Sequence, residues 1–331
     1  MNNDRSILQI VPRAPGGREG VGDYAGILSA KLEENYGYRT IFATAAELVR
    51  KDWRAPAAIA VVLHYVNYGY DPRGVPSWLP RRLEEIQRGG GRLITIFHEL
   101  YAERSWRRSA FWLQPWQKRI ARAIAKRSAL CLVSSAVLAD QLRALTREAR
   151  ILVRPVISTF GEPKLTAEQI NNRSPQRWVI CGGTDLVLRS LKSFPGKGDL
   201  YVVGGAEQSE IRRVLDQAHY LPDVEAEKAS AVLSSCSYGW LDYFESSAVP
   251  TAAILKSTAF AAYCAHGVIP VFPLSGSTIA LGADALPGPF YPENLPSESA
   301  RPEVAQATYD WYGRNASSAH LAATVAEAIA S

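Results

Sequence analysis

The sequence predicts two doubly wound α/β domains in tandem, and three observations lead to this fold class. Short apolar runs alternate with amphipathic helical stretches, and the runs are almost continuously apolar, as in parallel strands that are buried on both faces. The alternation breaks at residues 151–176, where prolines mix with polar residues, and then starts again. The length of 331 residues is that of two domains of ordinary size.

The first half of the chain carries five apolar runs that we interpret as strands. In chain order they are ILQIV (7–11), YRTIFAT (38–44), AAIAVVLHYV (57–66), RLITIFHEL (92–100) and ALCLVSS (129–135). The helices predicted between and after them cover residues 23–35, 80–88, 111–126 and a stretch that ends at Leu145. Because each helix returns the chain to the start of the next strand, these elements predict one parallel sheet.

The second half repeats this alternation after the linker at 151–176, and we place the domain boundary after residue 155. Its predicted strands are RWVICGG (177–183), DLYVVGG (199–205), SAVLSSCSYGW (230–240) and VIPVFP (268–273). Its predicted helices lie near 186–193, 207–217 and 254–267, and two more lie between 303 and 329. The predicted domains are therefore 1–155 and 156–305.

Composition and charge exclude several classes of protein. An apolar fraction of 47% with 21% charged residues is typical of a globular protein, and a net charge of +5 favours anionic ligands without indicating a nucleic-acid partner. The four cysteines form no CxxC pair and are expected to be buried thiols: Cys131, Cys181, Cys236 and Cys264. The sequence shows no signal peptide and no run that could span a bilayer, which predicts a cytoplasmic protein.

The stretch PRAPGGREGVGDYAGILSAKL (12–32) places glycines between the first strand and the first helix. Bare N–H groups and a helix start near Asp23 predict an approach of backbone to an anion, with a flexible connection as the alternative. The glycines fall as GGxxGxG and not as GxGxxG, and no GK[ST] follows. No acidic residue follows the second strand, so a dinucleotide site is not favoured.

Four motifs, in this order, resemble those of GT-B glycosyltransferases of family 4. PGGREGVGDYAGILSAKL resembles their N-terminal loop, and FHELYAERSWRRSAFWLQ resembles the segment that carries a histidine beside the sugar. VSS before a helix resembles the last strand of their first domain, and GWLDYFESSAVPTAAILKSTAFAAYCAHGVIPV resembles their donor-binding element. The resemblance implies two Rossmann-like domains facing a cleft. It also implies a C-terminal helix, 306–331, that crosses back to the first domain.

The resemblance further implies a role for individual residues. His98 would contact the transferred sugar, while Arg189 and Lys192 would neutralise the departing diphosphate. The alternatives are a structural histidine and solvated helix charges. The residues expected to bind the nucleoside-diphosphate sugar are Gly16, Gly17, Gly20, Gly182, Gly183, Lys256, Ser257 and Thr258.

The chain departs from the family pattern in one respect, because the two glutamates of the donor-binding element are missing. Counting back from Gly267 places Ala262 or Tyr263 where the second glutamate would hold the ribose. Lys256 and the helix start after it offer a cation, hydroxyls and N–H groups instead, which predicts a phosphate cradle. The alternative is that Ser257 is an ordinary N-cap.

On the acceptor side, His64, Tyr68 and Glu99 follow or end predicted strands, where they line a pocket or form a packed aromatic rim. The stretch 104–127 is the most basic in the chain and contains Trp106, Trp112 and Trp116. It predicts either peripheral contact with an anionic membrane or a solvated basic face.

These observations predict a glycosyltransferase that moves a sugar from a nucleoside-diphosphate donor to a saccharide or lipid-linked acceptor, as in polysaccharide biosynthesis. By resemblance the reaction would retain the anomeric configuration and would use no metal and no further cofactor. One alternative is a non-catalytic homologue that binds a nucleotide sugar or scaffolds partner enzymes. A third possibility is an epimerase on the same fold.

Overall fold

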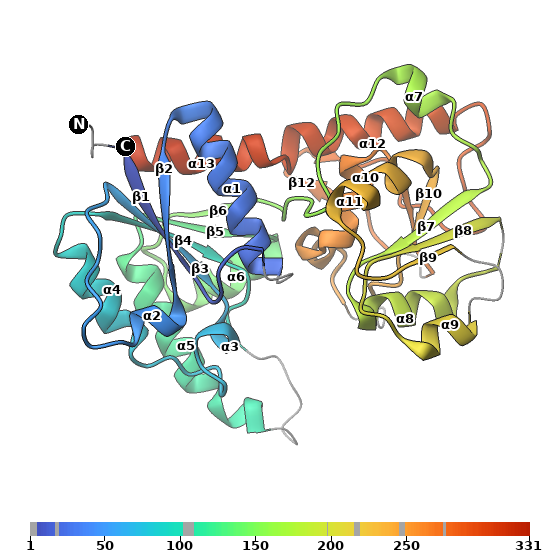
Figure 1. The fold of residues 1–331 in the computed structure, drawn as a ribbon. Coiled ribbons are helices and arrows are strands. Elements are labelled where there is room, and N and C mark those ends of the chain that lie inside the picture. Colours follow the sequence, from blue (N-terminus) through green and yellow to red (C-terminus); the bar gives the residue numbers. More distant parts are fainter. Residues whose placement is uncertain are drawn as a thin grey trace. The chain divides into compact units, whose positions relative to one another are not determined.

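The computed structural model describes residues 5–16, 20–101, 109–196, 198–214, 219–244, 249–273 and 276–331. The chain divides into two compact units, each of which is an α/β domain (Figure 1). The first unit comprises residues 1–154 and 318–331, and the second comprises residues 155–317. The chain therefore rejoins the first unit at Ser318, later than residue 306, where the C-terminal helix was expected to begin.

The first unit is built on a six-stranded parallel sheet with the order β2-β1-β3-β4-β5-β6. The strands are β1 (Ser6–Val11), β2 (Arg39–Thr44), β3 (Ala60–Tyr65), β4 (Arg92–Phe97), β5 (Leu130–Val133) and β6 (Ile151–Val153). From β1 the strand order runs in one direction to β2 and in the other direction to β3 and beyond. The point where the order reverses is where open α/β sheets bind ligands, outside the carboxyl ends of the strands.

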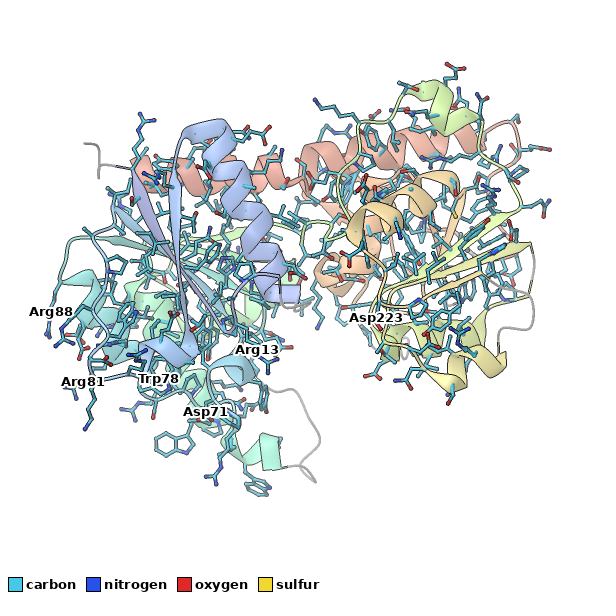
Figure 2. All side chains as sticks on the ribbon, viewed as in Figure 1. Arg13, Asp71, Trp78, Arg81, Arg88 and Asp223 are labelled. Atoms are coloured by element: carbon cyan, nitrogen blue, oxygen red, sulfur yellow. The ribbon has the colours of Figure 1, made fainter. Side chains whose placement is uncertain are left out.

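The helices of the first unit are α1 (Gly20–Tyr36), α2 (Ala45–Leu48), α3 (Asn67–Tyr70), α4 (Leu79–Gln87), α5 (Ser109–Arg127), α6 (Ala136–Leu145) and α13 (Ser318–Ala330). Helices α1 and α13 pack against each other, whereas α4 packs against α5. Leu79, Leu83 and Ile86 of α4 are buried, because their spacing places them on one helical face. Arg81 and Arg88 of the same helix point outward (Figure 2).

The second unit contains a five-stranded parallel sheet with the order β11-β10-β7-β8-β9. Its strands are β7 (Arg177–Cys181), β8 (Asp199–Val203), β9 (His219–Leu221), β10 (Tyr238–Trp240) and β11 (Ile269–Val271), and β12 (Ala280–Leu281) pairs with β13 (Asp284–Ala285) in a separate hairpin. Here the strand order reverses between β7 and β10.

The helices of the second unit are α7 (Ala167–Asn171), α8 (Thr184–Ser193), α9 (Ser209–Val214), α10 (Ala226–Ser235), the 3-10 helix η1 (Thr251–Lys256), α11 (Thr258–Ala265) and α12 (Arg301–Asn315). Every residue of α11 after Thr258 is buried, so this helix is the central one of the unit. It packs against α12 and β11.

Two differences from the sequence prediction have clear physical causes. The segment 151–176 is not wholly a linker, because Ile151–Val153 pairs with β5 as the sixth strand. The run 230–240 is a strand only from Tyr238, since Ala229 and Leu233 bury the same face of α10. Short apolar runs of this kind fit a buried helix as well as a strand.

No helix among the described residues is both long enough and apolar enough to cross a membrane.

Two buried arginines hold the second unit together at the amino-terminal edge of its sheet. The Arg173 guanidinium donates to the carbonyl oxygens of Cys236, His266 and Gly267 at 3.3, 2.8 and 2.9 Å. Arg301 Nη1 donates to the Arg173 carbonyl oxygen at 2.9 Å. Desolvation lowers the pKa of Arg173 to about 10, and at neutral pH the side chain remains charged.

We predict that Arg173→Leu lowers the free energy of unfolding of the second unit by on the order of 3 kcal/mol, because three buried carbonyl groups lose their donor. The control is Arg212→Leu, whose side chain is exposed and pairs with Glu207. Chemical denaturation of both variants measures the difference. Equal midpoints for the two variants would contradict the structural role of Arg173.

Candidate functional site

In the first unit, the carboxyl ends of β1, β3 and β4 bring together a chain of polar side chains. Gln9 of β1 and His64 of β3 are fully buried, although both lie inside strands. Gln9 Oε1 lies 2.8 Å from His64 Nε2, and His64 Nδ1 lies 3.4 Å from His98 Nε2. His98 directly follows β4, and its N–H donates to the Tyr65 carbonyl oxygen at 2.9 Å.

The hydrogen bonds of this chain assign a tautomer to each histidine. Gln9 Nε2 donates to Thr40 Oγ1 at 3.4 Å, which leaves Gln9 Oε1 to accept from the Nε2–H of His64. His64 Nδ1 then accepts from the Nε2–H of His98. Nδ1 of His98 is therefore left as a hydrogen-bond acceptor at the edge of the sheet.

Desolvation keeps both rings neutral at pH 7. Desolvation lowers the pKa of His98 to about 4, and desolvation together with the neighbouring His98 lowers the pKa of His64 well below its usual range. The two rings stack with centroids 5.6 Å apart, and Tyr24 of α1 meets them edge-on at 5.8 and 5.0 Å. Burial also raises the pKa of Tyr24, so its hydroxyl stays protonated.

Tyr70, in the run of tyrosines that follows His64, is a further residue of this site. Its hydroxyl lies 3.2 Å from the Ile10 carbonyl oxygen and 3.0 Å from that of His64. It therefore ties the ends of β1 and β3 together at the point where the strand order reverses. The run of tyrosines around it gave only a general signal, because its partners are backbone groups of other strands.

The glycine loop lies beside this chain, directly after β1. Gly16 has a φ of +87°, and a Cβ added to Gly16 or Gly20 would meet no atom within 4 Å. Gly22 instead allows close packing, since its Cβ would lie 3.1 Å from the Ala14 carbonyl oxygen. Gly17 lies outside the described residues. The loop thus presents open backbone at Gly16 and Gly20 and packed backbone at Gly22.

The other two residues predicted on the acceptor side, Tyr68 and Glu99, lie at the surface. Glu99 is exposed, and 39% of the Tyr68 surface is exposed on α3. The Tyr68 hydroxyl accepts from Gln117 Nε2 at 3.4 Å, which connects α3 to α5.

In the second unit, the predicted glycines form two adjoining turns after β7 and β8. Gly182 and Gly204 have φ values of +133° and +89°, and a Cβ on Gly204 would lie 2.8 Å from the Gly182 carbonyl oxygen. These turns therefore require glycine. Gly183 is the N-cap residue of α8, and a Cβ added to it would meet nothing within 4 Å.

Arg189 of α8 reaches the carboxyl end of β10, across the reversal point of the second sheet. Its Nε donates to the Asp242 carbonyl oxygen at 2.6 Å, and its Nη2 donates to that of Tyr243 at 3.3 Å. Lys192 lies nearly one helical turn further along and is exposed. The guanidinium of Arg189 is thus held in place by backbone, at the position where the fold places ligands.

Lys256 is exposed at the end of η1, and Ser257 is the N-cap residue of α11. The Ser257 hydroxyl oxygen accepts from the Phe260 N–H at 3.3 Å, as an ordinary cap does, and Thr258 begins the helix. Ser257 therefore has the ordinary N-cap role that was the alternative to phosphate binding. Its N-cap role does not exclude a ligand at the remaining N–H groups of the helix start.

The two positions at which the family pattern has its second glutamate are fully buried here. Ala262 and Tyr263 each have 0% of their surface exposed. The Tyr263 hydroxyl accepts from the Cys181 N–H at 3.0 Å and lies 3.1 and 3.0 Å from the carbonyl oxygens of Val179 and Trp240. Neither position can present a side chain to a ligand in this conformation.

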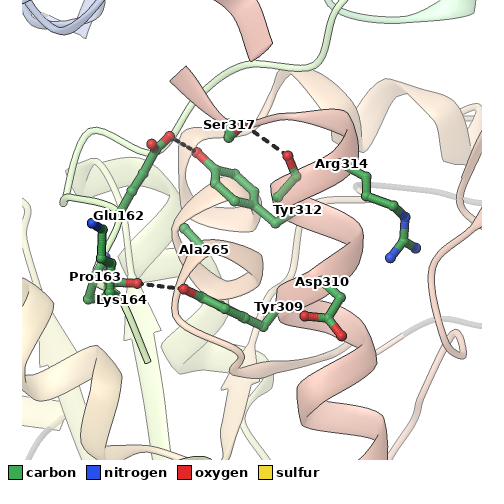
Figure 3. A pocket seen from close by; sticks show the side chains of 10 residues that line it. Glu162, Pro163, Lys164, Ala265, Tyr309, Asp310, Tyr312, Arg314 and Ser317 are labelled. Carbon is green, nitrogen blue, oxygen red and sulfur yellow. Dashed lines mark hydrogen bonds between the residues drawn. The ribbon is translucent and has the colours of Figure 1, made fainter. Parts of the chain in front are cut away.

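A cavity of about 430 Å³ in the second unit involves none of the predicted donor residues (Figure 3). It lies along α12 and the segment that enters the unit. The Tyr312 hydroxyl donates to Glu162 Oε1 at 2.6 Å and accepts from the Ser158 N–H at 2.8 Å, while the Tyr309 hydroxyl donates to the Pro163 carbonyl oxygen at 2.9 Å. These bonds anchor the entering segment to α12. Tyr309, Trp311 and Tyr312 of α12 therefore belong to the second unit.

Within the described part of the chain, no three His, Cys, Asp or Glu side chains gather as metal ligands would. The four cysteines are buried and free.

No protein-family model matches this sequence, and no curated protein matches it. Solved structures do match the fold. The N-terminal domain of trehalose-6-phosphate phosphatase from Candida albicans has a TM-score of 0.56 and 10% identity, over 98% of this chain and 97% of that one. A DNA-modifying β-glucosyltransferase, solved with and without the substrate uridine diphosphoglucose, has a TM-score of 0.51 and 10% identity, over 98% and 99%. The fold class expected from the sequence, two Rossmann-like domains as in GT-B glycosyltransferases, is confirmed.

We predict that the free energy of unfolding falls as the pH drops from 6.5 to 4, because the unfolded chain binds protons there that His98 in the folded chain does not. One such histidine contributes a slope of about 1.4 kcal/mol per pH unit. The variant His98→Gln keeps an N–H beside His64 but cannot titrate, so its slope should be smaller. Denaturant titrations between pH 4.5 and 7.5 compare the two proteins, and parallel pH curves would count against a neutral buried His98.

Proposed function

We propose that this protein is a glycosyltransferase that uses a nucleoside-diphosphate sugar as its donor. The observation that carries the proposal is the coincidence of the predicted residues with the reversal points of both sheets. The glycine loop and His98 surround the carboxyl ends of β1, β3 and β4, and Arg189 spans the reversal between β7 and β10. The fold is shared with a glucosyltransferase whose substrate is uridine diphosphoglucose.

In this reaction the bond between the anomeric carbon and the donor phosphate oxygen breaks, an acceptor hydroxyl oxygen bonds to the same carbon, and the proton of that hydroxyl passes to the departing phosphate oxygen. Negative charge grows on the leaving diphosphate, so fixed cations beside it stabilise the transition state. We assign this role to Arg189 and Lys192, with no bound metal and no further cofactor. The backbone contacts of Arg189 support the assignment, because they hold the guanidinium in one place before the donor binds.

The neutral histidine pair suits contact with an uncharged sugar. His98 Nδ1 can accept a hydrogen bond from a sugar hydroxyl, while its Nε2–H is already committed to His64. A charged imidazolium would favour a phosphate instead. The proposed acceptor is a saccharide or a lipid-linked saccharide that approaches from the side of His64, Tyr68 and Glu99, and the proposed outcome is retention, as in family 4.

The donor is proposed to lie on the second unit, over Gly182, Gly183 and the start of α11. Lys256 would bind the diphosphate. Ala262 and Tyr263 provide no carboxylate for the ribose, so we expect recognition of the donor to depend mainly on charge. This same feature favours the second candidate function, a non-catalytic homologue that binds a nucleotide sugar. Both candidates bind the nucleotide sugar, but only the glycosyltransferase turns it over.

A thermal-shift panel of UDP, GDP, ADP and dTDP tests both candidates. Stabilisation by one nucleotide is the expected result, because a ligand that binds only the folded protein raises its melting temperature. Hydrolysis or transfer of the matching nucleotide sugar then separates an enzyme from a binding protein. No response to any nucleotide would contradict both.

We predict that Lys256→Ala weakens binding of the stabilising nucleotide by about 10- to 150-fold, the loss of one hydrogen bond to a charged group. The loss should shrink at high salt, since this contact is exposed and is screened. Lys228→Ala, which removes an exposed lysine of α10, is the matched control and should bind like the wild type. If Lys256→Ala also binds like the wild type at low and high salt, the donor is held elsewhere.

A further inference from the structure

Helix α5 presents two large aromatic side chains to solvent. Trp112 is 69% exposed and Trp116 is 57% exposed, whereas Gln117, Ile120 and Ala121 on the opposite face are buried. Positions four apart lie on the same side of a helix, so Trp112 and Trp116 share one face of α5. Exposed tryptophans at this spacing are costly for a surface that stays in water.

Cations continue the same outward face toward the end of the helix. Arg119, Arg122 and Lys126 are all exposed, and their spacing from Trp112 and Trp116 places them on one side of α5. The face runs over about 21 Å from Trp112 to Lys126, at about 1.5 Å per residue. It is aromatic at one end and basic at the other.

The basic end leads into a cavity of about 340 Å³ between the last turns of α5 and α6. Four cations line it, Arg122, Lys126, Arg143 and Arg147, with Glu148 as the only acid among its lining residues. Lys126 pairs with Glu148 at 3.5 Å and Arg143 pairs with Asp140 at 2.9 Å, so the lining keeps a net positive charge.

Thr146 supplies a second, independent sign of a ligand at this cavity. It lines the cavity and is only 5% exposed, yet among the described residues its hydroxyl oxygen has no hydrogen-bond partner. A buried polar atom without a partner is rare in folded proteins. A small anion with several acceptor oxygens would satisfy the hydroxyl and the surrounding cations together.

This cavity is separate from the proposed glycosyl-transfer site. Helix α5 leads from the end of β4 to the start of β5, so its last turn lies at the amino-terminal edge of the parallel sheet. His98 and the glycine loop lie at the carboxyl edge. The end of α5 that carries Trp112 is the end nearer to His98.

We propose that the outward face of α5 binds the surface of a bilayer that contains anionic phospholipids. The cavity takes the phosphate of a headgroup, and Trp112 and Trp116 enter the interface beside it. Tryptophan favours this boundary because its ring is apolar and its N–H is polar, and basic residues add attraction to anionic lipids. The cations of this face would also suit a nucleic acid. A nucleic acid would, however, cover less of the apolar surface of the two indoles than a bilayer does.

The test is cosedimentation of the full chain with vesicles of phosphatidylcholine alone and with 30% phosphatidylglycerol added. The protein should bind the anionic vesicles, and binding should weaken as salt rises. Arg122→Ala with Arg147→Ala should weaken it about 25-fold, at about fivefold for each cation removed. Both side chains are exposed, so the variant should fold normally.

The matched control is Arg39→Ala with Lys51→Ala, which removes the same charge at the opposite edge of the sheet, near β2. It should bind the vesicles like the wild type. Equal weakening by the two double variants would overturn the proposal, because net charge alone would then explain the binding.

Brominated lipids test the tryptophans directly. Their bromines should quench part of the tryptophan fluorescence of the wild type, and Trp112→Phe with Trp116→Phe should remove that quenching. Absence of quenching in the wild type would overturn the proposal, and so would binding of inorganic phosphate or of a DNA duplex without binding of the vesicles. None of these measurements needs a nucleotide sugar, so they stand or fall apart from glycosyl transfer.

Discussion

Burial of both faces of each parallel sheet is the constraint on which the rest of this structure depends. Strands covered on both sides must be apolar along their length, so polar chemistry is confined to the loops after them. Gln9 and His64 break this rule, because both lie inside strands and are fully buried. They can do so because each satisfies the other, and the chain of hydrogen bonds continues to His98 and to Thr40. The exception thus marks the site.

A second theme is the use of tyrosine hydroxyls to hold backbone together. Tyr70 joins the ends of β1 and β3, and Tyr263 joins β7 to β10 from the middle of α11. The Tyr263 ring fits only because Gly239 faces it, where a Cβ would lie 2.6 Å from the ring. Each tyrosine acts at the reversal point of its sheet, where no helix crosses to connect the neighbouring strands. These bonds hold in place the strands beside which each proposed site lies.

Part of the candidate site could be predicted from the sequence, but the partners of its side chains could not. The sequence shows glycines, a histidine and an arginine after apolar runs, because the end of a strand is a local feature of the chain. The partner of each is not local. Gln9 and His64 are 55 positions apart, and Arg189 meets the carbonyl groups of Asp242 and Tyr243 more than fifty positions on. Gln9 carried no sequence signal, because a single glutamine in an apolar run has no characteristic spacing.

The sequence by itself determined the fold class, most of the strands and helices, and the loops at which chemistry is expected. These follow from periodicity and from glycine and proline, which act over a few residues. The tertiary structure decided the order of the strands, and with it which loops meet. It also decided that the segment 151–153 is a strand, that Tyr263 points inward, and that the basic end of α5 faces α6 across a cavity. Strand order depends on which helices cover which face, and that is settled only when distant segments pack together.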